Sequence, residues 1–456
     1  MEYFSVEGSW WVPERDTQAI PGTFTFDSGG LTLLLRGGSL EPSSASFGEP
    51  FAMPFIHGRT HDGQDVSLLN ADGLALGAHG TVKEADYRAD LALLGCHASS
   101  DAFVQAETEF DYLDAWAAPP SIREDSGRND LITVRPGLTE LASAAVDGDN
   151  IQLISRVFGR WSDASVHLER SCAFSVDCAQ PKQLQEILNL RIRPLHDLLT
   201  FTLGRPVRMT RFRLKLGDAG GAAAKMCDAY FSALQPAKSS GIRAVKGANA
   251  PTLLTAASAP MNLTSLLERW FILWDEEQEE LALLLAPDYA PFMYSVHKFL
   301  CAFQCAESLA KSKKRCGSRD LDKSVYKARK RAVEEAVAGL DNETVAWVNR
   351  RLEGNNKLLK DLIEEFVRST GAVGNAVFEA APDFATTVAR ARGGISHGGS
   401  RAEAAAPVDL HWLGEVLRWV IRARLLRELA LTDIEHRVLE REPFRFALEQ
   451  TKMAPA

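Results

Sequence analysis

A hairpin pattern occupies Gly22-Thr23-Phe24-Thr25-Phe26-Asp27-Ser28-Gly29-Gly30-Leu31-Thr32-Leu33-Leu34-Leu35-Arg36. Two short apolar runs flank Ser28-Gly29-Gly30, and glycine permits the tight turn that joins antiparallel strands. The same alternation of short apolar runs with Gly, Asp, Asn and Pro continues through the first 170 residues. We therefore expect an antiparallel, mainly β region, followed by a helix over 181–203 and a strand over 207–216.

The periodicity changes after a stretch rich in Gly, Ala, Ser and Pro over 217–260. Beyond it, apolar residues recur at helical spacing. Candidate helices cover 262–285, 288–312, 323–338, 343–352, 355–369, 382–391 and 408–430. The predicted fold class is α+β and multidomain, with a β-rich antiparallel amino-terminal domain over 1–240, a linker over 241–260 and an all-α helical bundle over 261–445.

Composition narrows the class of protein. The chain has 456 residues, of which 46% are hydrophobic and 24% charged, so it is not of the disordered class. It shows neither a secretory signal nor a run of about 18 apolar residues, which predicts a cytoplasmic protein that does not enter a membrane. Seven cysteines are too few for a disulfide scaffold and lack zinc-site spacing, so we expect reduced thiols, no metal site and no cofactor.

Charge is unevenly distributed along the chain, whose net charge is −9. Residues 1–100 contain five Lys or Arg against thirteen Asp or Glu, whereas residues 311–331 contain ten Lys or Arg against two Asp. Such a basic segment favours a partner that carries phosphates. A solvated loop that runs into a polar helix face is the alternative. The candidate nucleic-acid-binding residues are Lys311, Lys313, Lys314, Arg315, Lys327, Arg329, Lys330 and Arg331. We expect the acidic run over 275–280 to be a solvated helix face.

An Arg and a His recur in the segment Arg390-Ala391-Arg392-Gly393-Gly394-Ile395-Ser396-His397, with four residues between Arg392 and His397 and six between Arg390 and His397. This spacing, in a helical domain, resembles the R-x4-6-H signature of the HEPN superfamily. Upstream, Phe303-Gln304-Cys305-Ala306-Glu307-Ser308-Leu309 resembles the helix of these domains that carries a Gln and a Glu.

The first half carries a second resemblance. It is similar to the amino-terminal domain of ApeA-type anti-phage proteins, which precedes a HEPN domain. The residues that carry this similarity are Gly8-Ser9-Trp10-Trp11-Val12-Pro13, Pro21-Gly22-Thr23-Phe24, Leu31 to Gly37, Ile56-His57-Gly58-Arg59-Thr60, Val66 to Leu69 and Tyr112-Leu113-Asp114-Ala115-Trp116.

The resemblance implies a metal-independent endoribonuclease used in abortive-infection defence against phage. In this class of reaction the 2'-hydroxyl of RNA is the nucleophile, and a 2',3'-cyclic phosphate is the product. His397 suits proton transfer because histidine titrates near neutrality, and Arg392 suits stabilisation of charge on phosphate oxygens. Glu307, Arg390 and Ser396 are the supporting candidates. Family motifs place a polar residue directly after the Arg, whereas Gly393 stands there in this chain.

The HEPN resemblance also implies a composite site formed by two copies, and hence a homodimer or larger homo-oligomer. RNA is the implied partner, with transfer RNA among the structured candidates, and the phage trigger is unknown. A non-catalytic HEPN-like module that binds RNA or a nucleotide is the alternative function. A scaffold protein is a third reading of the same sequence.

Overall fold

The computed structural model describes residues 3–13, 15–40, 50–75, 84–117, 137–162, 165–217, 225–231, 253–254, 263–290, 292–312, 314–352, 354–397, 407–429 and 434–452. The chain forms two compact units, Met1–Ile272 and Leu273–Ala456. The predicted linker over 241–260 lies outside the described residues except for Leu253 and Leu254, which are buried. Among the described helices, none combines the length and apolar character needed to span a bilayer.

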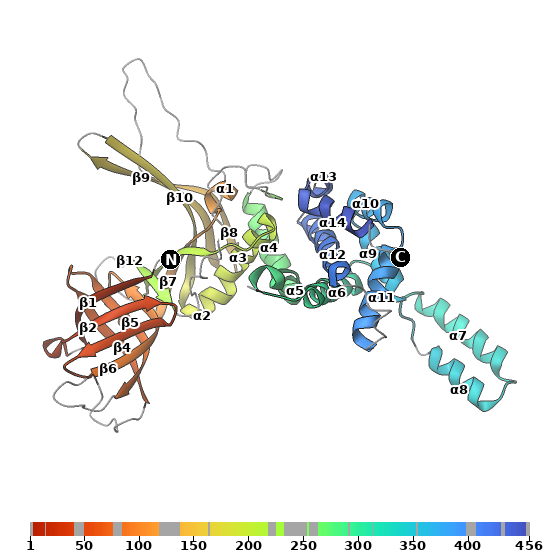
Figure 1. The fold of residues 1–456 in the computed structure, drawn as a ribbon, viewed down its shortest axis with the longest axis horizontal. Coiled ribbons are helices and arrows are strands. Elements are labelled where there is room, and N and C mark those ends of the chain that lie inside the picture. The colour runs from red at the N-terminus through yellow and green to blue at the C-terminus, as the bar shows by residue number, and fades with distance from the viewer. Residues whose placement is uncertain are drawn as a thin grey trace, which may run out of the picture. The chain divides into compact units, whose positions relative to one another are not determined.

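The first unit is built on an antiparallel sheet in which neighbouring strands pair in the order β3-β2-β1-β4-β5-β6-β12-β11-β7-β10-β9-β8 (Figure 1). Its strands are β1 (Phe4–Trp11), β2 (Ile20–Asp27), β3 (Gly30–Arg36), β4 (Pro50–Thr60), β5 (Asp65–Ala75), β6 (Glu84–Leu94), β7 (Ala102–Phe110), β8 (Gly137–Val146), β9 (Asp149–Ser162), β10 (Ser165–Gln183), β11 (Met209–Leu216) and β12 (Met226–Phe231). The predicted hairpin is confirmed as β2 and β3, which pair from Gly22 with Leu35 to Asp27 with Gly30.

Strand β6 belongs to two parts of this sheet. One of its edges pairs with β5 along almost its whole length. The other edge pairs with β3 over residues 84–89 and with β12 over residues 91–94. The pairing with β3 closes the first six strands into a barrel, and the pairing with β12 connects that barrel to the remaining strands.

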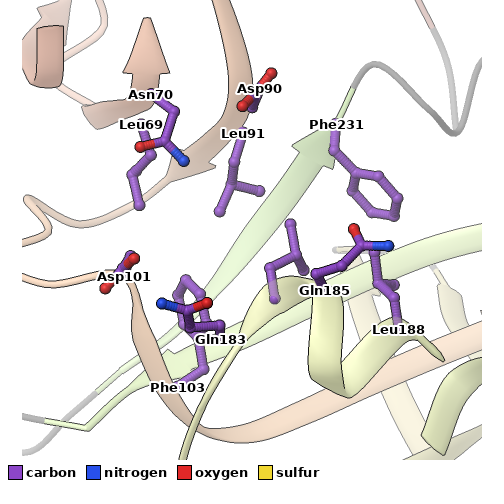
Figure 2. Close-up of a pocket in the computed structure, with 11 residues that line it drawn as sticks. Leu69, Asn70, Asp90, Leu91, Asp101, Phe103, Gln183, Gln185, Leu188 and Phe231 are labelled. Carbon is purple, nitrogen blue, oxygen red and sulfur yellow. The ribbon is translucent and has the colours of Figure 1, made fainter. Parts of the chain in front are cut away.

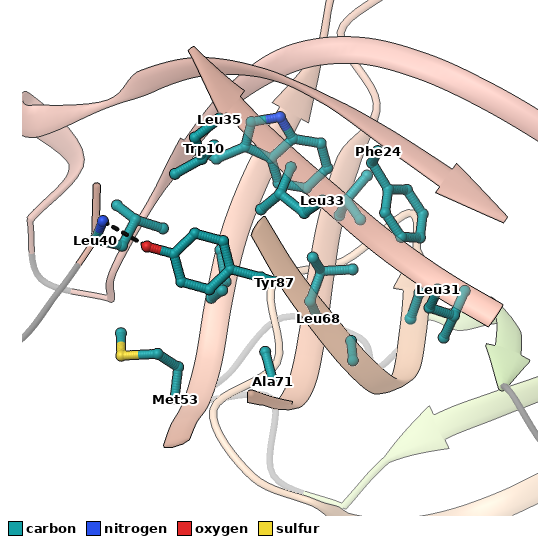
Figure 3. Close-up of a cluster of buried hydrophobic side chains, with 14 of the residues drawn as sticks. Trp10, Phe24, Leu31, Leu33, Leu35, Leu40, Met53, Leu68, Ala71 and Tyr87 are labelled. Atoms are coloured by element: carbon teal, nitrogen blue, oxygen red, sulfur yellow. Dashed lines mark hydrogen bonds between the residues drawn. The ribbon is translucent and has the colours of Figure 1, made fainter. Parts of the chain in front are cut away.

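The barrel encloses a core of aromatic and aliphatic side chains (Figure 3). Trp10 is fully buried, and its indole N–H donates to the carbonyl of Gly22 at 3.3 Å. The hydroxyl of Tyr87, also buried, accepts a hydrogen bond from the N–H of Leu40 at 2.8 Å. Gly58 lies opposite Trp10 in the β1–β4 register, where the indole covers the place that a Cβ would take. Glycine at this position is therefore a packing requirement of the core.

The helices of the first unit differ in part from prediction. They are η1 (Asp16–Gln18), α1 (Leu113–Ala117), α2 (Leu184–Ile187), the π-helix η2 (Leu188–Ile192), α3 (Arg193–Leu203) and the start of α4 (Leu263–Glu276). The predicted helix over 181–203 begins three residues late, because Lys182 and Gln183 still pair with Phe103 and Ala102 of β7. Pairing across the sheet overrides the local helical period there.

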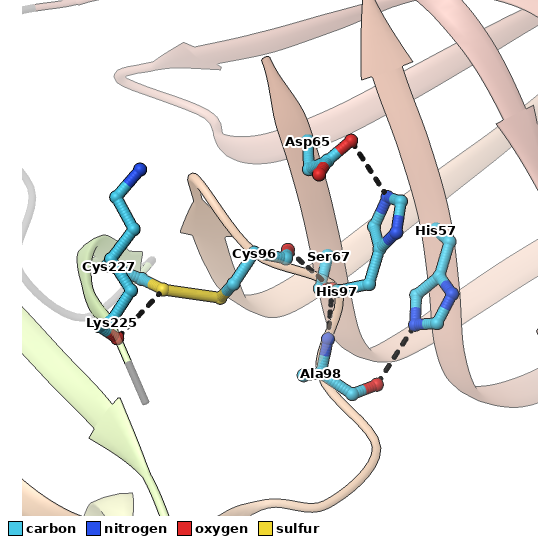
Figure 4. The surroundings of a disulfide bond; sticks show 8 residues. All are labelled: His57, Asp65, Ser67, Cys96, His97, Ala98, Lys225 and Cys227. Carbon is cyan, nitrogen blue, oxygen red and sulfur yellow. Dashed lines mark hydrogen bonds and ion pairs between the residues drawn. A yellow bond between two sulfur atoms is a disulfide. The ribbon is translucent and has the colours of Figure 1, made fainter. Parts of the chain in front are cut away.

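Two cysteines of the first unit are joined, which corrects the expectation of reduced thiols (Figure 4). Cys96 follows β6 and Cys227 lies in β12, and their Cα atoms are 6.3 Å apart. The predicted thiols remain free elsewhere: Cys172, Cys178, Cys301, Cys305 and Cys316 are unpaired. Burial raises the pKa of Cys172 to about 12 and that of Cys178 to about 11, so both stay protonated and unreactive near neutral pH.

The second unit is a helical bundle, which confirms the predicted fold class. Its helices are α5 (Gln278–Tyr289), α6 (Ser295–Lys311), α7 (Lys323–Val337), α8 (Asn342–Arg351), α9 (Leu359–Arg368), α10 (Ala372–Ala380), α11 (Phe384–His397), α12 (Pro407–Glu428), α13 (Ile434–Leu439) and α14 (Glu442–Lys452). Helix α12 is buried along most of its length, and it packs against α6, α10, α13 and α14. Its Arg418 and Arg422 lie 2.6 Å and 3.0 Å from the carboxylate of Asp288 in α5.

Three differences from the predicted helices matter for the site. The helix expected over 262–285 is two helices, α4 and α5, which meet at Glu277. The helix expected over 382–391 continues to His397, so the Arg/His segment is helical. The short helices α10, α13 and α14 were not predicted. Helices α7 and α8 form a hairpin that stands apart from the other helices of its unit (Figure 1).

Replacement of Gly58 by Ala should destabilise the first unit, because the added methyl group would collide with the buried ring of Trp10. We expect a loss of about 1–3 kcal/mol in the free energy of unfolding, measured by denaturant titration. Gly137→Ala is the matched control, because a Cβ at Gly137 meets no atom within 4 Å in the described part of the chain. Equal stability of the two variants would contradict the packing argument.

The stability of the barrel should also depend on His57. Its ring stacks on His97 with centroids 4.7 Å apart, and its Nε2 lies 2.9 Å from the carbonyl of Ala98. Desolvation by burial lowers the pKa of His57 below its ordinary value of 6.5, and the charge of His97 acts in the same direction. Because the unfolded chain then takes up the proton more readily, the free energy of unfolding should fall as the pH falls below about 6.5. His57→Gln keeps a hydrogen-bond donor and should flatten this dependence in unfolding titrations between about pH 7.5 and 5.5, whereas an unchanged slope would exclude His57 as the cause.

Candidate functional site

Helix α11 carries the residues of the Arg/His segment. Arg390 and Arg392 lie in its last two turns, and the helix ends at His397. Arg390 is exposed, whereas Arg392 is partly buried against its neighbours. The side chains of Ser396 and His397 lie outside the part of the chain that the structure describes. The candidate site is therefore built here from Arg392 and the helices that surround it.

A pocket of about 470 Å³ lies against Arg392. Helix α6 contributes Glu307 and Lys311, and helix α9 contributes Leu359 and Leu362. The remaining lining residues are Ser318, Asn356 and Lys357, which come from the connections before α7 and before α9. The fold thus brings together Glu307 and Arg392, two of the residues singled out in the sequence, from helices far apart along the chain.

The pocket has an excess of positive charge. Lys311 Nζ lies 2.7 Å from the carboxylate of Glu307, whose side chain is 22% exposed. Lys357 donates to the carbonyl of Cys316 at 2.9 Å and to the carboxylate of Glu365. Of the residues that the structure describes, three cations and one carboxylate therefore line the pocket, since Glu365 is not among the lining residues.

Arg392 differs from the other two cations of the pocket in its lack of a partner within the described part of the chain. Among the described residues, no carboxylate lies within 4 Å of its guanidinium, and no hydrogen bond ties its side chain. Lys311 and Lys357, in contrast, are held by carboxylates. A guanidinium presents a fixed fork of donors that matches phosphate oxygens. The arrangement suits a phosphate group that contacts Arg392 first.

Backbone pairing holds the polar wall of the pocket in place. The N–H of Lys357 donates to the carbonyl of Ser318 at 3.0 Å, and Arg319 forms an isolated antiparallel bridge with Asn356. The side chain of Asn355 adds a donor to the carbonyl of Leu321 at 2.7 Å. These contacts close the base of the α7–α8 hairpin, so the hairpin begins at the edge of the pocket.

The basic residues predicted to bind nucleic acid fall into three groups. The first group is exposed or partly exposed, and each of its cations lies within 4 Å of a carboxylate. Its pairs are Lys311 with Glu307, Lys314 with Glu276, Lys330 with Glu334 and Arg331 with Glu335. Arg315 is buried between Glu277 and Glu428, with a side chain that is only 2% exposed. Lys327 and Arg329 lie in α7 with no carboxylate within 4 Å among the described residues, and Lys313 lies outside those residues.

The placement of Arg315 corrects the prediction of a solvated helix face over 275–280 at Glu277, whereas Asp275, Glu276, Gln278 and Glu279 are exposed as predicted. Glu277 is 8% exposed and lies 3.0 Å from the guanidinium of Arg315. Burial raises the pKa of Glu277, and its hydrogen bond with Arg315 opposes that rise. Arg315 and Glu277 therefore stabilise the bundle rather than face solvent.

Sequence reasoning did not find Ser318, Asn356 and Lys357 as residues of the pocket. The only sequence signal was the polar turn Gly354-Asn355-Asn356-Lys357 ahead of α9. Such turns are common at the surface, and nothing local marks this one as facing a pocket.

A second pocket, of about 330 Å³, lies in the first unit (Figure 2). Buried Leu91, Phe103 and Phe231 form its apolar part. Its exposed polar residues are Asn70, Asp90, Asp101, Gln183 and Gln185. It lies where β6 and β12 meet β7 and the start of α2, and no sequence motif predicted it.

Substitutions at the Arg392 pocket should change the affinity of the protein for inorganic phosphate. Arg392→Gln should reduce the rise in Tm that phosphate produces, whereas Glu307→Gln should increase it by removing the carboxylate that holds Lys311. Thermal unfolding across a phosphate titration measures both effects. Lys452→Gln, an exposed change at the end of α14, is the control. An equal rise in Tm for the parent and Arg392→Gln would contradict the assignment of Arg392 as the anion ligand.

Comparison with known families agrees with both units. Residues 5–244 match the family model described as ApeA N-terminal domain 1, and residues 300–435 match the model described as Apea-like HEPN. The second match includes Glu307 and Arg392, and HEPN domains are generally nuclease-like. No curated protein and no solved structure matches the chain. The chain belongs to the ApeA-type family of defence-associated proteins, in which an ApeA amino-terminal domain precedes an ApeA-like HEPN domain.

Proposed function

We propose that this protein is a metal-independent endoribonuclease of anti-phage defence, which acts in the cytoplasm by abortive infection. The observation that supports the proposal best is the pocket in which Arg392, which has no carboxylate partner among the described residues, lies beside Glu307, Lys311 and Lys357. Its excess of positive charge matches the phosphate backbone of RNA. Membership of the ApeA-type family supports the same assignment.

The chemistry requires few protein groups, because RNA supplies its own nucleophile. The 2'-hydroxyl loses its proton to a base and attacks the adjacent phosphorus, and the bond from phosphorus to the 5'-oxygen breaks. The leaving oxygen takes up a proton, and a 2',3'-cyclic phosphate remains. We assign the proton transfers to His397 and the stabilisation of negative charge on the phosphate oxygens to Arg392. Glu307 holds Lys311 beside the reacting phosphate, and Arg390 and Ser396 are supporting residues.

The proposal includes a homodimer or larger assembly, in which the ends of two α11 helices form one composite site. Each copy would then contribute an Arg392 and a His397, so that one histidine accepts a proton while the other donates one. RNA is the substrate, with transfer RNA as a candidate. We assign the sensing of the phage trigger to the first unit, whose pocket beside Phe103 and Phe231 offers a place for a ligand.

A second function is favoured by Gly393, which stands where family motifs carry a polar residue. Gly393 lies inside α11, and outside its own helix no atom of the described residues lies within 4 Å of a Cβ built on it. No side chain at that position therefore assists Arg392. A non-catalytic module that binds RNA or a nucleotide would need only the cations of the pocket, whereas in the ribonuclease Asn356 offers a polar group beside Arg392.

Replacement of His397 by Ala separates the two functions. For the ribonuclease, His397→Ala should reduce RNA cleavage at least about 100-fold and abolish phage defence, because the proton transfers lose their carrier. Cleavage is measured with a chelator present, by gel and by detection of cyclic phosphate ends, and defence is measured by plaque counts at matched expression. His436→Ala, an exposed histidine in α13, is the control and should leave both intact. Defence by both variants with no cleavage by the parent would exclude the ribonuclease and favour the binding module.

A further inference from the structure

The α7–α8 hairpin displays an exposed tryptophan. Neither α7 nor α8 contains a buried residue, so the hairpin contributes no side chain to the buried core of the bundle. Trp347 in α8 is 53% exposed, so about half of the large apolar area of its indole faces solvent. The guanidinium carbon of Arg351, one turn later, lies 5.8 Å from the centre of the Trp347 ring. A cation thus covers part of one face of the indole.

This pair has the chemistry of a site for an unpaired nucleic-acid base. Aromatic rings bind bases of any sequence by stacking, and neighbouring arginines add cation–π and phosphate contacts. We propose that Trp347 and Arg351 form a stacking platform for single-stranded RNA and guide that strand toward the Arg392 pocket. This inference rests on the proposed function and specifies the form of its substrate, an unpaired segment rather than a duplex.

The position of the platform fits this role. The hairpin starts from the pocket wall, where Arg319 bridges to Asn356. The hydroxyl of Tyr326 in α7 donates to the carbonyl of Leu352, which fastens the end of α8 to α7. Trp347 precedes Leu352 by little more than one turn, or about 8 Å along the helix axis. The platform therefore lies midway along α8, between the tip of the hairpin and its base beside the pocket.

The unpaired charges among the described residues of the hairpin favour RNA over a protein partner. Lys323, Lys327, Arg329 and Arg350 are exposed cations with no carboxylate within 4 Å among the described residues. The acidic residue of α8, Glu343, lies one turn before Trp347 on the side away from the pocket, and Arg350 and Arg351 follow on the pocket side. Exposed Leu340 lies at the tip of the hairpin, well separated from Trp347, so the two do not form a continuous apolar surface.

The test is equilibrium binding of fluorescent RNA to the full chain carrying His397→Ala, which prevents cleavage. The probes are a 12-nucleotide adenine-rich single strand and a 12-base-pair duplex, and fluorescence anisotropy is measured at about 0.1 M salt. Addition of Trp347→Ala should weaken binding of the single strand about tenfold and leave duplex binding unchanged, because paired bases cannot stack on the indole. Trp347→Phe keeps a ring and should lose less affinity than Trp347→Ala.

Leu340→Ala is the matched control, since it removes an equally exposed apolar side chain from the same hairpin. Its affinity for both probes should equal that of the parent. Unchanged single-strand binding in Trp347→Ala would overturn the platform, and if phage defence were nevertheless lost, the hairpin would be a protein-binding surface. A third outcome separates the two proposals. If Trp347→Ala loses affinity for the single strand but the chain with an intact His397 cleaves no RNA, the platform is retained and the ribonuclease is rejected.

Discussion

The buried guanidinium of Arg315 is the interaction on which the geometry of the helical unit depends. It donates to both carboxylate oxygens of Glu428 at 2.7 Å and lies 3.0 Å from Glu277. A buried charge is tolerated only where opposite charges and hydrogen bonds replace its lost hydration. The chain that leaves α6 must therefore meet the start of α5 and the end of α12 at once. This constraint sets the path of the residues that follow, which form the pocket wall and the base of the hairpin.

Much of the fold was predictable because its deciding patterns are local. The β2–β3 hairpin pairs residues that are close together in the sequence. The alternating apolar side chains that identify it, such as Phe24 and Leu33, are buried. The start of the helix after β10 was not predictable, since Lys182 and Gln183 are kept extended by partners in β7. The extension of α11 to His397 was missed because Gly393 and Gly394 have low helix propensity, which the surrounding bundle overrides.

The candidate site was predictable only where a motif identified it. The HEPN resemblance singled out Arg392 and Glu307, and the structure places both at one pocket. Lys357 and Asn356 were missed because their position follows from pairing with Ser318 and Arg319 across the whole hairpin. Arg315 was assigned to the surface because ten cations in a short segment look alike in sequence. Its carboxylate partners, Glu277 and Glu428, lie far away along the chain.

One edge of β6 pairs with two different strands, and this pairing limits how the first unit can be divided into smaller folded pieces. The strand closes the barrel through β3 and also pairs with β12, whose other edge continues into the second part of the sheet. Hydrogen bonds run without interruption from one part to the other, and the Cys96–Cys227 bond spans the same junction. No cut in the chain can separate the barrel without exposing an unpaired strand edge, which invites aggregation. The two parts should therefore unfold together as one cooperative unit.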